Sequence, residues 1–287
     1  VGRRGRHDSH DEDLRNPRSL DSFIEDAYSH GSTLPVPYWI LMFSLGVANS
    51  SDASEILCLN YILSDEEFED SFLGDSPWRA GLLAAAVFWG MLIGGLVVGF
   101  LGDLNGRRPM LIMGLVCNSV AGILSACAQD VYQLSIIRAV AGLGIGATVP
   151  PLFTLVTELS PPSRRGFFVT FCASFWMVGS IYVALAALLV WEYLGFSWRV
   201  FAVLCAAPSA LGALLVGTLV PESPRFLAMN GHTEKSLNNA NTIALKKLGY
   251  EGSAWTMQEL LYYYPPRSSY LISGASQRQQ EDCCQTV

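Results

Sequence analysis

Two acidic residues lie only three positions apart inside a long apolar stretch near the start of the chain. Asp52 and Glu55 interrupt the run from about 38 to 63, and this spacing puts both carboxyl groups on one face of a helix. Arg138 stands at the head of another apolar run. At 1.5 Å per residue, the acids lie roughly 12–17 Å from the end of their helix near Leu63, and the arginine about 10 Å from the end of its helix near Val131. These two ends are expected on the same side of the helix bundle. The spacing therefore predicts an ion pair between two helices.

This cluster admits two interpretations. Arg138 could form a fixed bridge with Asp52 or with Glu55 that only holds the helices together. Alternatively, the three residues form a proton or substrate site, because a nearby arginine controls the ionisation of a carboxyl group. One carboxylate then pairs with the arginine, and the other, left unpaired in a low-dielectric setting, carries the proton. Asp52 is the preferred carrier because it lies deeper in the helix.

The composition indicates a membrane protein. Of 287 residues, 51% are hydrophobic and only 15% are charged, with a mean hydropathy of +0.33. A soluble domain has about 25% charged residues, so an ordinary soluble enzyme is disfavoured. The net charge of −7 disfavours a nucleic-acid binder. The seven cysteines have no metal-site spacing. We expect no enzyme activity, no metal and no cofactor.

The apolar residues are concentrated in blocks that are long enough to cross a bilayer. A span needs roughly 20 apolar residues. Five charge-free blocks approach or exceed this length, namely 80–102, 109–129, 139–157, 167–191 and 200–221. The acid-containing run at 38–63 is the sixth. The sequence predicts an all-α integral membrane bundle of six spans, with five as the alternative.

The two ends of the chain differ from this middle part. The polar, charged stretch 1–36 is predicted to be a disordered cytoplasmic tail, and 37–227 the six-span membrane domain. Residues 228–287 are predicted to form a cytoplasmic loop and a polar tail, largely disordered, with a short amphipathic helix near 235–248. Because the chain begins with Val, we expect a fragment, an isoform or an incomplete gene model.

Basic residues near the ends of the spans predict the orientation. Pairs of arginines follow the second and fourth spans, and Arg225 follows the sixth, whereas the loop at 65–75 is acidic. Cytoplasmic loops are enriched in Lys and Arg. Both termini are therefore predicted to be cytoplasmic, in either the plasma membrane or an intracellular vesicle membrane.

The turn after the second span carries the most specific motif. It reads Gly99-Phe-Leu-Gly102-Asp103-Leu-Asn-Gly106-Arg107-Arg108-Pro109. The first two glycines are predicted to allow close approach of helices, and Gly106 a tight turn. Asp103 can accept hydrogen bonds from the arginines or from a helix N-terminus. The alternative is a basic turn that only sets the orientation.

Further motifs follow in order along the chain. Arg138 is followed by three alternating glycines, Gly142, Gly144 and Gly146. A dinucleotide loop is excluded there, since no strand precedes the glycines and they lie in a predicted span. Two further motifs combine acids and arginines: Glu158-Leu-Ser-Pro-Pro-Ser-Arg164-Arg165-Gly166 and Pro221-Glu222-Ser-Pro-Arg225-Phe-Leu.

Together these motifs resemble those of the major facilitator superfamily. The glycine-rich turn is similar to the signature G-x-L-A-D-x-x-G-R-[RK], and the last motif to the end of the sixth span in sugar porters. Within the superfamily, Ser51-Asp52-Ala-Ser-Glu55, Phe175-Trp-Met-Val-Gly179 and Ser197-Trp-Arg-Val-Phe201 look like synaptic vesicle protein 2-like transporters. The resemblance covers about 38–240.

The resemblance implies the N-terminal half of a transporter, built from two three-helix inverted repeats. The second six-span half has no counterpart here. It further implies that a first-span acid pairs with the fourth-span arginine, and that charged residues at the cytoplasmic ends form a gating network. The members of this network are predicted to be Asp103, Arg107, Arg108, Glu158, Arg164, Arg165, Glu222 and Arg225.

The predicted function is secondary active transport of a small polar solute, a sugar or an organic ion, coupled to protons and working by alternating access. The predicted partners are the lipid bilayer, the solute, protons and the missing half. The alternative is a truncated, non-transporting membrane protein with an interaction or regulatory role.

Overall fold

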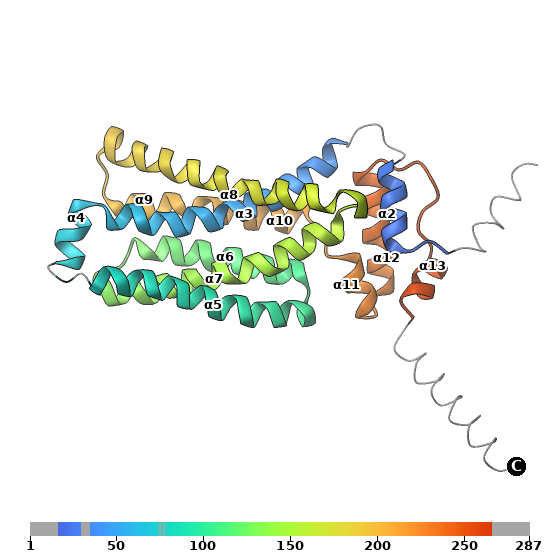
Figure 1. The fold of residues 1–287 in the computed structure, drawn as a ribbon, viewed down its shortest axis with the longest axis horizontal. Helices are drawn as coiled ribbons and strands as arrows, with labels where there is room; N and C mark the ends of the chain where they lie inside the picture. Colours follow the sequence, from blue (N-terminus) through green and yellow to red (C-terminus); the bar gives the residue numbers. More distant parts are fainter. Residues whose placement is uncertain (1–16, 30–34, 75, 77, 266–287) are drawn as a thin grey trace, which may run out of the picture. The chain divides into compact units, whose positions relative to one another are not determined.

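The computed structural model describes residues 17–29, 35–74, 76 and 78–265 (Figure 1). Its described residues belong to two compact units. One comprises Val36–Glu222, and the other combines the residues up to Pro35 with those from Ser223 onward. All regular elements of the described residues are helical, so the prediction of an all-α fold is confirmed.

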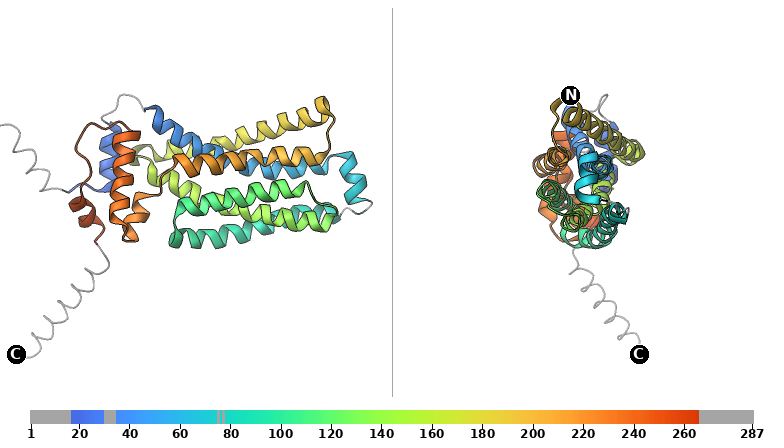
Figure 2. Two further views of the ribbon diagram at one scale, coloured as in Figure 1. Left: turned by 180° about the vertical axis from the view of Figure 1, so that it is seen from behind. Right: turned by 90° about the vertical axis from the view of Figure 1, so that its left-hand side faces the viewer.

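The first unit is a bundle of long helices, which run side by side in Figure 2. They are α3 (Val36–Leu63), α5 (Trp78–Asn105), α6 (Arg107–Ser125), α7 (Val131–Leu159), α8 (Arg165–Ala187) with its continuation η3 (Leu188–Leu194), and α9 (Trp198–Cys205) followed by α10 (Ala207–Leu219). Short elements lie between them: α4 (Glu66–Phe68), η1 (Glu69–Leu73) and η2 (Pro162–Arg164).

Five helical segments of the described residues are long and apolar enough to cross a membrane. They are Trp78–Asn105, Arg107–Ser125, Val131–Leu159, Pro162–Leu194 and Trp198–Leu219. Helix α3 is long enough, with 28 residues, but is not among them. Its middle carries polar residues from Asn49 to Glu55, all of which are buried against the neighbouring helices. Of the six predicted spans, five are therefore supported by their length and composition. Helix α3 is assigned to the bundle because its residues are buried against the neighbouring helices.

Glycines bring helices α5 and α7 into close contact. A Cβ atom on Gly90 of α5 would lie 2.1 Å from the Ala139 carbonyl oxygen. One on Gly142 of α7 would lie 2.1 Å from the carbonyl oxygen of Val87. Because real Cβ atoms do not approach so closely, only glycine fits at this backbone-to-backbone contact. Gly146 packs in the same way against Met91 of α5.

The other glycines singled out by the sequence behave differently. Gly144 faces α6, where a Cβ would lie 2.7 Å from the Asn118 nitrogen. Gly106 has a φ of 107° at the start of α6, a conformation that favours glycine. At Gly99 and Gly102, however, a Cβ would meet nothing within 4 Å. The expected close approach at these two positions is absent, and the space beside them is part of an open pocket next to Asp103.

The second unit is a small helical assembly drawn from distant parts of the chain. It contains α2 (Leu20–Ser29), α11 (Pro224–Met229), α12 (Thr233–Asn241) with its continuation η4 (Thr242–Lys247), and α13 (Met257–Tyr263). Phe23 is fully buried, with its ring stacked 6.2 Å from that of Trp255 and edge-on, 6.0 Å away, to Tyr250. Burial of these apolar rings holds α2 on the later segment.

This unit corrects the expected disorder at both ends of the chain. Residues 20–29 are helical, although 1–36 was predicted to be disordered, and 257–263 are helical within the predicted polar tail. The physical reason is that each segment buries an apolar face against the other. The remaining parts of those predictions, 1–16 and 266–287, lie outside the described residues.

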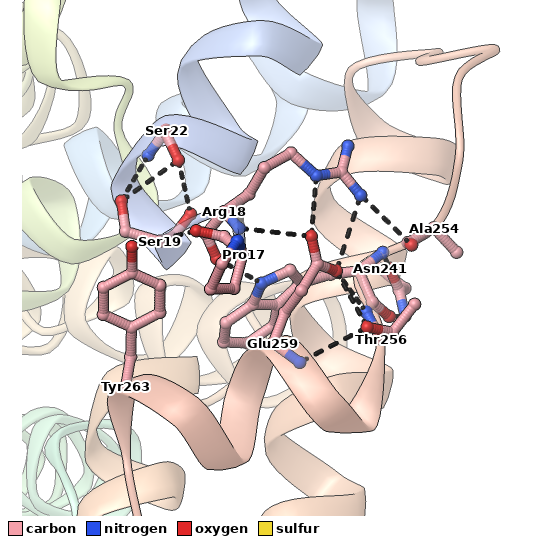
Figure 3. A network of polar contacts seen from close by, with 10 residues as sticks. Pro17, Arg18, Ser19, Ser22, Asn241, Ala254, Thr256, Glu259 and Tyr263 are labelled. Atoms are coloured by element: carbon pink, nitrogen blue, oxygen red, sulfur yellow. Dashed lines mark hydrogen bonds and ion pairs between the residues drawn. The ribbon is translucent and has the colours of Figure 1, made fainter. Parts of the chain in front are cut away.

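Polar contacts fix the start of α2 (Figure 3). The Arg18 backbone N–H and Nε donate to the Glu259 carboxylate over 3.3 and 2.8 Å. The indole of Trp255 donates to the Arg18 carbonyl over 3.1 Å, and the Tyr263 hydroxyl donates to the Pro17 carbonyl over 2.9 Å. Burial raises the pKa of Glu259, but the hydrogen bonds from Arg18 and Thr256 outweigh it, so that this pKa lies below its ordinary value.

Candidate functional site

Helices α3 and α7 bring the three predicted charged residues together inside the bundle. Asp52 and Glu55 lie on one face of α3, and Arg138 comes from the first half of α7. Their exposed fractions are 0, 2 and 1%. Each of them thus lies among neighbouring helices, where an ionised group requires a partner.

The arginine pairs with the second acid. Arg138 Nη1 donates to Glu55 Oε2 over 3.0 Å, and its Nη2 lies 3.8 Å from the Cys58 sulfur. Glu55 Oε1 and Arg138 Nε are buried without a hydrogen-bond partner among the described residues. The pair is therefore held by a single charge-assisted hydrogen bond and is not bidentate.

Asp52 instead meets hydroxyl groups. The Thr148 Oγ1 atom lies 2.9 and 2.8 Å from the two Asp52 carboxyl oxygens, and the Ser51 Oγ lies 3.4 Å from Oδ1. Of the two pairings that the sequence left open, the structure contains Arg138 with Glu55. Asp52 is thus the acid that lacks a direct contact with the arginine.

Thr148 was missed by the sequence analysis, although a signal was present. In the stretch 139–153 of α7 it is the only residue whose side chain can form a hydrogen bond. A single hydroxyl in fifteen otherwise apolar, glycine or proline residues of a predicted span indicates a polar partner on a neighbouring helix.

A second group of charged residues gathers at the Arg107 end of the bundle. Arg107 Nη2 lies 3.3 Å from Asp103 and 3.8 Å from Glu158. The Glu222 carboxylate accepts hydrogen bonds from the backbone N–H groups of Arg107 and Arg108, each at 3.2 Å. Because these N–H groups begin α6, the carboxylate also meets the positive end of the helix dipole.

The side chain of Arg108 and the remaining predicted members of this network also contact residues outside this group. Arg108 donates to the Gly217 carbonyl, and Arg165 Nε donates to the Thr157 carbonyl over 3.1 Å. Arg164 is exposed in η2. Arg225 belongs to the other unit, where its Nη2 donates to Asp21 over 2.9 Å. The observed contacts join Asp103, Arg107, Arg108, Glu158 and Glu222. That all eight predicted residues form one gating network stays a prediction.

No group of three His, Cys, Asp or Glu side chains in the described part of the chain could hold a metal ion. The site is thus made of two carboxyls, one guanidinium and a small number of hydroxyl and thiol groups. Such groups can exchange protons and form hydrogen bonds.

Comparisons with known proteins concern the family and the fold of the chain. The family model described as "Sugar (and other) transporter" matches residues 23–249. Synaptic vesicle glycoprotein 2A from Rattus norvegicus is 35% identical over 211 residues, which are 69% of this chain and 28% of that protein. Synaptic vesicle glycoprotein 2B from Homo sapiens is 32% identical over 223 residues, 74% of this chain and 32% of that protein. The chain thus spans about a third of the length of these relatives.

Solved structures show the same fold. The xylose transporter XylE from E. coli, in a partially occluded inward open conformation, superposes with a TM-score of 0.66 at 20% identity, over 75% of this chain and 56% of that one. The proton:xylose symporter XylE bound to 6-bromo-6-deoxy-D-glucose gives 0.62 at 22% identity, over 74 and 52%. The predicted half of a major facilitator fold is confirmed.

Proposed function

Since the chain belongs to the sugar (and other) transporter family, a family of membrane transporters and not of enzymes, we propose that its helical bundle is half of a secondary active transporter for a small polar solute. The other half is proposed to be a second six-span bundle, in keeping with the 56 and 52% of the two XylE chains that this chain covers. A sugar is the preferred solute class, because the similar XylE structures are described with xylose and a bromodeoxyglucose.

The proposed coupling ion is the proton, with Asp52 as its carrier. Glu55 engages Arg138 directly, whereas Asp52 is fully buried beside hydroxyl groups that hydrogen-bond either form of the acid. A buried carboxylate without a cation partner costs free energy, so the acid is favoured in its protonated form. Such an acid can take up a proton and release it when water reaches it. The Glu55–Arg138 pair then has a supporting role in holding α3 to α7.

Alternating access is the proposed mechanism. The contacts of Arg107 with Asp103 and Glu158 join the ends of α5, α6 and α7, and would hold one conformational state of the transporter closed. By the distribution of basic residues, we place this end, and both termini, in the cytoplasm. The membrane is either the plasma membrane or a vesicle membrane, the latter in keeping with the vesicle names of the relatives.

The observation that carries the proposal is the burial of Asp52 against Thr148 of α7, while Arg138, the buried cation of the site, pairs with Glu55. Its test uses the full-length protein in proteoliposomes, with an inward proton gradient and radiolabelled D-xylose and D-glucose as probes. The parent should accumulate a probe above equilibrium. Asp52→Asn should abolish accumulation but retain exchange of the probe down its gradient.

The matched control is Asp70→Asn, which makes the same change at an exposed acid of η1. It should accumulate the probe as the parent does. If Asp52→Asn accumulates as well as the parent at every pH tested, Asp52 is not the carrier. If neither probe accumulates in the parent while a panel of organic ions does, the sugar assignment is wrong.

A further inference from the structure

Thr148 has more hydrogen-bond acceptors around it than one hydroxyl proton can serve. Its Oγ1 lies 2.7 Å from the Ile145 carbonyl oxygen and 2.8 Å from an Asp52 carboxyl oxygen. A threonine hydroxyl has one proton to donate and two lone pairs to accept with. Both short contacts can be separate two-centre hydrogen bonds only if Thr148 donates to Ile145 and a protonated Asp52 donates to Thr148.

The second hydroxyl near Asp52 leads to the same result. Ser51 Oγ lies 2.7 Å from the Ala48 carbonyl oxygen but 3.4 Å from Asp52 Oδ1. Its proton is therefore directed to its own helix. With both hydroxyl protons directed to helix carbonyls, a charged Asp52 would have no committed donor, and a fully buried carboxylate without one is strongly disfavoured. The arrangement fits Asp52 in its protonated form.

We propose that Thr148 is a positioning residue that couples the protonation of Asp52 to the conformation of α7, an inference that rests on the proposed function. In the protonated state the chain of hydrogen bonds runs from Asp52 through Thr148 to the Ile145 carbonyl. When Asp52 releases its proton to water, the Thr148 hydroxyl turns and donates to the carboxylate. Ile145 then loses its side-chain partner, and no other bond is made or broken.

Helix α7 is weakest where this change acts. Pro150 and Pro151 follow Thr148 within the helix and have no N–H groups, so that the carbonyls of Gly146 and Ala147, four residues earlier, lose their helical partners. A threonine hydroxyl that bonds a carbonyl of the preceding turn often bends a helix. The direction of the Thr148 proton therefore changes a bend at a point that already lacks two backbone hydrogen bonds.

The same helix reaches the charged group at its other end. Beyond the two prolines, α7 continues to Leu159 and carries Glu158, whose carboxylate lies 3.8 Å from Arg107. A change of bend at Thr148 moves this carboxylate relative to α5 and α6. The coupling is therefore mechanical, through one helix, and requires no charged residue between the two sites.

Few charged groups face Asp52. In the described part of the bundle, the buried charged residues are Asp52, Glu55 and Arg138. Glu55 lies on the same helix, and Arg138 on α7 engages it; helices α8 and α10, which also pack against α3, contribute Gly179 and Gly212 near this level. A pH response of this site is accordingly assigned to Asp52 if the Asp52→Asn substitution removes it.

The first test is infrared difference spectroscopy of the full chain in nanodiscs between low and high pH. A carbonyl band of a protonated carboxyl group that disappears in Asp52→Asn identifies Asp52. Thr148→Val should shift this band to higher frequency, because the carboxyl loses its hydrogen-bond acceptor, and Thr148→Ser should leave it in place. Thr154→Val is the matched control, since Thr154 bonds the Pro150 carbonyl of the same helix over 2.8 Å; it should not move the band.

The second test is the pH profile of probe accumulation by the full-length protein. Thr148→Val should shift the pH of half-maximal accumulation upward by about one unit, because a hydrogen bond to a charged acceptor is stronger than one to a neutral group. Thr148→Ser should restore the profile of the parent.

The two tests separate the inference from the proposed function. An Asp52 band that Thr148→Val leaves unmoved, or that Thr148→Ser shifts equally, overturns the inference. So does the absence of any band that Asp52→Asn removes. A parent that shows the band and its shift but accumulates none of the probes supports the hydrogen-bond chain and contradicts the transport proposal.

Discussion

Arg138 and Glu55 are expected to stabilise the bundle as a pair, because either charge alone would be buried without compensation. Both are almost fully buried and share one hydrogen bond of 3.0 Å. Removal of one partner from a buried pair costs about 3–5 kcal/mol, because the other charge stays behind uncompensated. We expect Arg138→Met to lower the stability of the bundle by about that much. Thermal unfolding of the purified protein in detergent measures the effect.

The double variant provides the control. When Glu55→Gln accompanies Arg138→Met, no uncompensated charge is left, and most of the lost stability should return. Equal unfolding temperatures of the single and double variants would contradict the pairing, since Arg138 would then act through its packing alone.

The sequence predicts the composition of this site better than its pairings. Burial of Asp52, Glu55 and Arg138 follows from their places in apolar runs. Which acid meets the arginine depends on how α3 is rotated and shifted against α7, to within one helical turn. Periodicity along a single helix contains no information on that register, because both acids share one face. Thr148, on the partner helix, was overlooked although its isolated hydroxyl in an apolar run was a signal of a polar partner.

At the scale of helices, the contact between α5 and α7 depends on glycine. Gly90→Ala would place a Cβ 2.1 Å from the Ala139 carbonyl oxygen, so that the two backbones must move apart. We expect a loss of about 1–3 kcal/mol, the usual cost of overpacking. Gly81→Ala, on the same helix but with nothing within 4 Å of its Cβ, should be neutral or slightly stabilising.

Thermal unfolding of both variants in one detergent compares them directly. Equal melting temperatures for Gly90→Ala and Gly81→Ala would mean that the two helices can separate without loss. The contact would then not contribute to stability.

Long apolar elements could be predicted from the sequence, whereas short amphipathic ones could not. The five charge-free blocks correspond to helices because a span must satisfy its backbone internally. Helix α2 was missed, although Leu20, Phe23, Ile24 and Ala27 follow the helical spacing and are all buried. The acidic residues of the same segment make the apolar stripe difficult to recognise in the sequence. Trp255, against which α2 packs, lies more than 200 positions later in the chain.

For the molecule as a whole, the second unit ties together segments that precede and follow the bundle. Glu259 accepts from both the backbone and the side chain of Arg18. We expect Glu259→Gln to speed tryptic cleavage after Arg18 at least about fivefold, since a hydrogen bond to a charged group contributes 1 kcal/mol or more. Mass spectrometry of timed digests measures this rate.

The control is Glu234→Gln, at an exposed acid of α12 in the same unit, which should be cleaved as the parent is. Because the pKa of Glu259 lies below its ordinary value of 4.5, the charged pair is complete above about that pH. Its contribution is lost only as the pH falls through the lowered value. Equally fast cleavage of the parent and Glu259→Gln would contradict the role of the Glu259 hydrogen bonds in protecting Arg18.

The stacking of Phe23 on Trp255 also sets an order of events on the ribosome. Synthesis proceeds at about 5–20 residues per second, so the α2 segment emerges on the order of 10–50 s before the residues that cover it. Throughout that interval its apolar stripe is exposed, while the spans enter the membrane one after another. Burial of this stripe therefore requires that translation has passed Trp255, and a chain that stalls earlier leaves the stripe exposed.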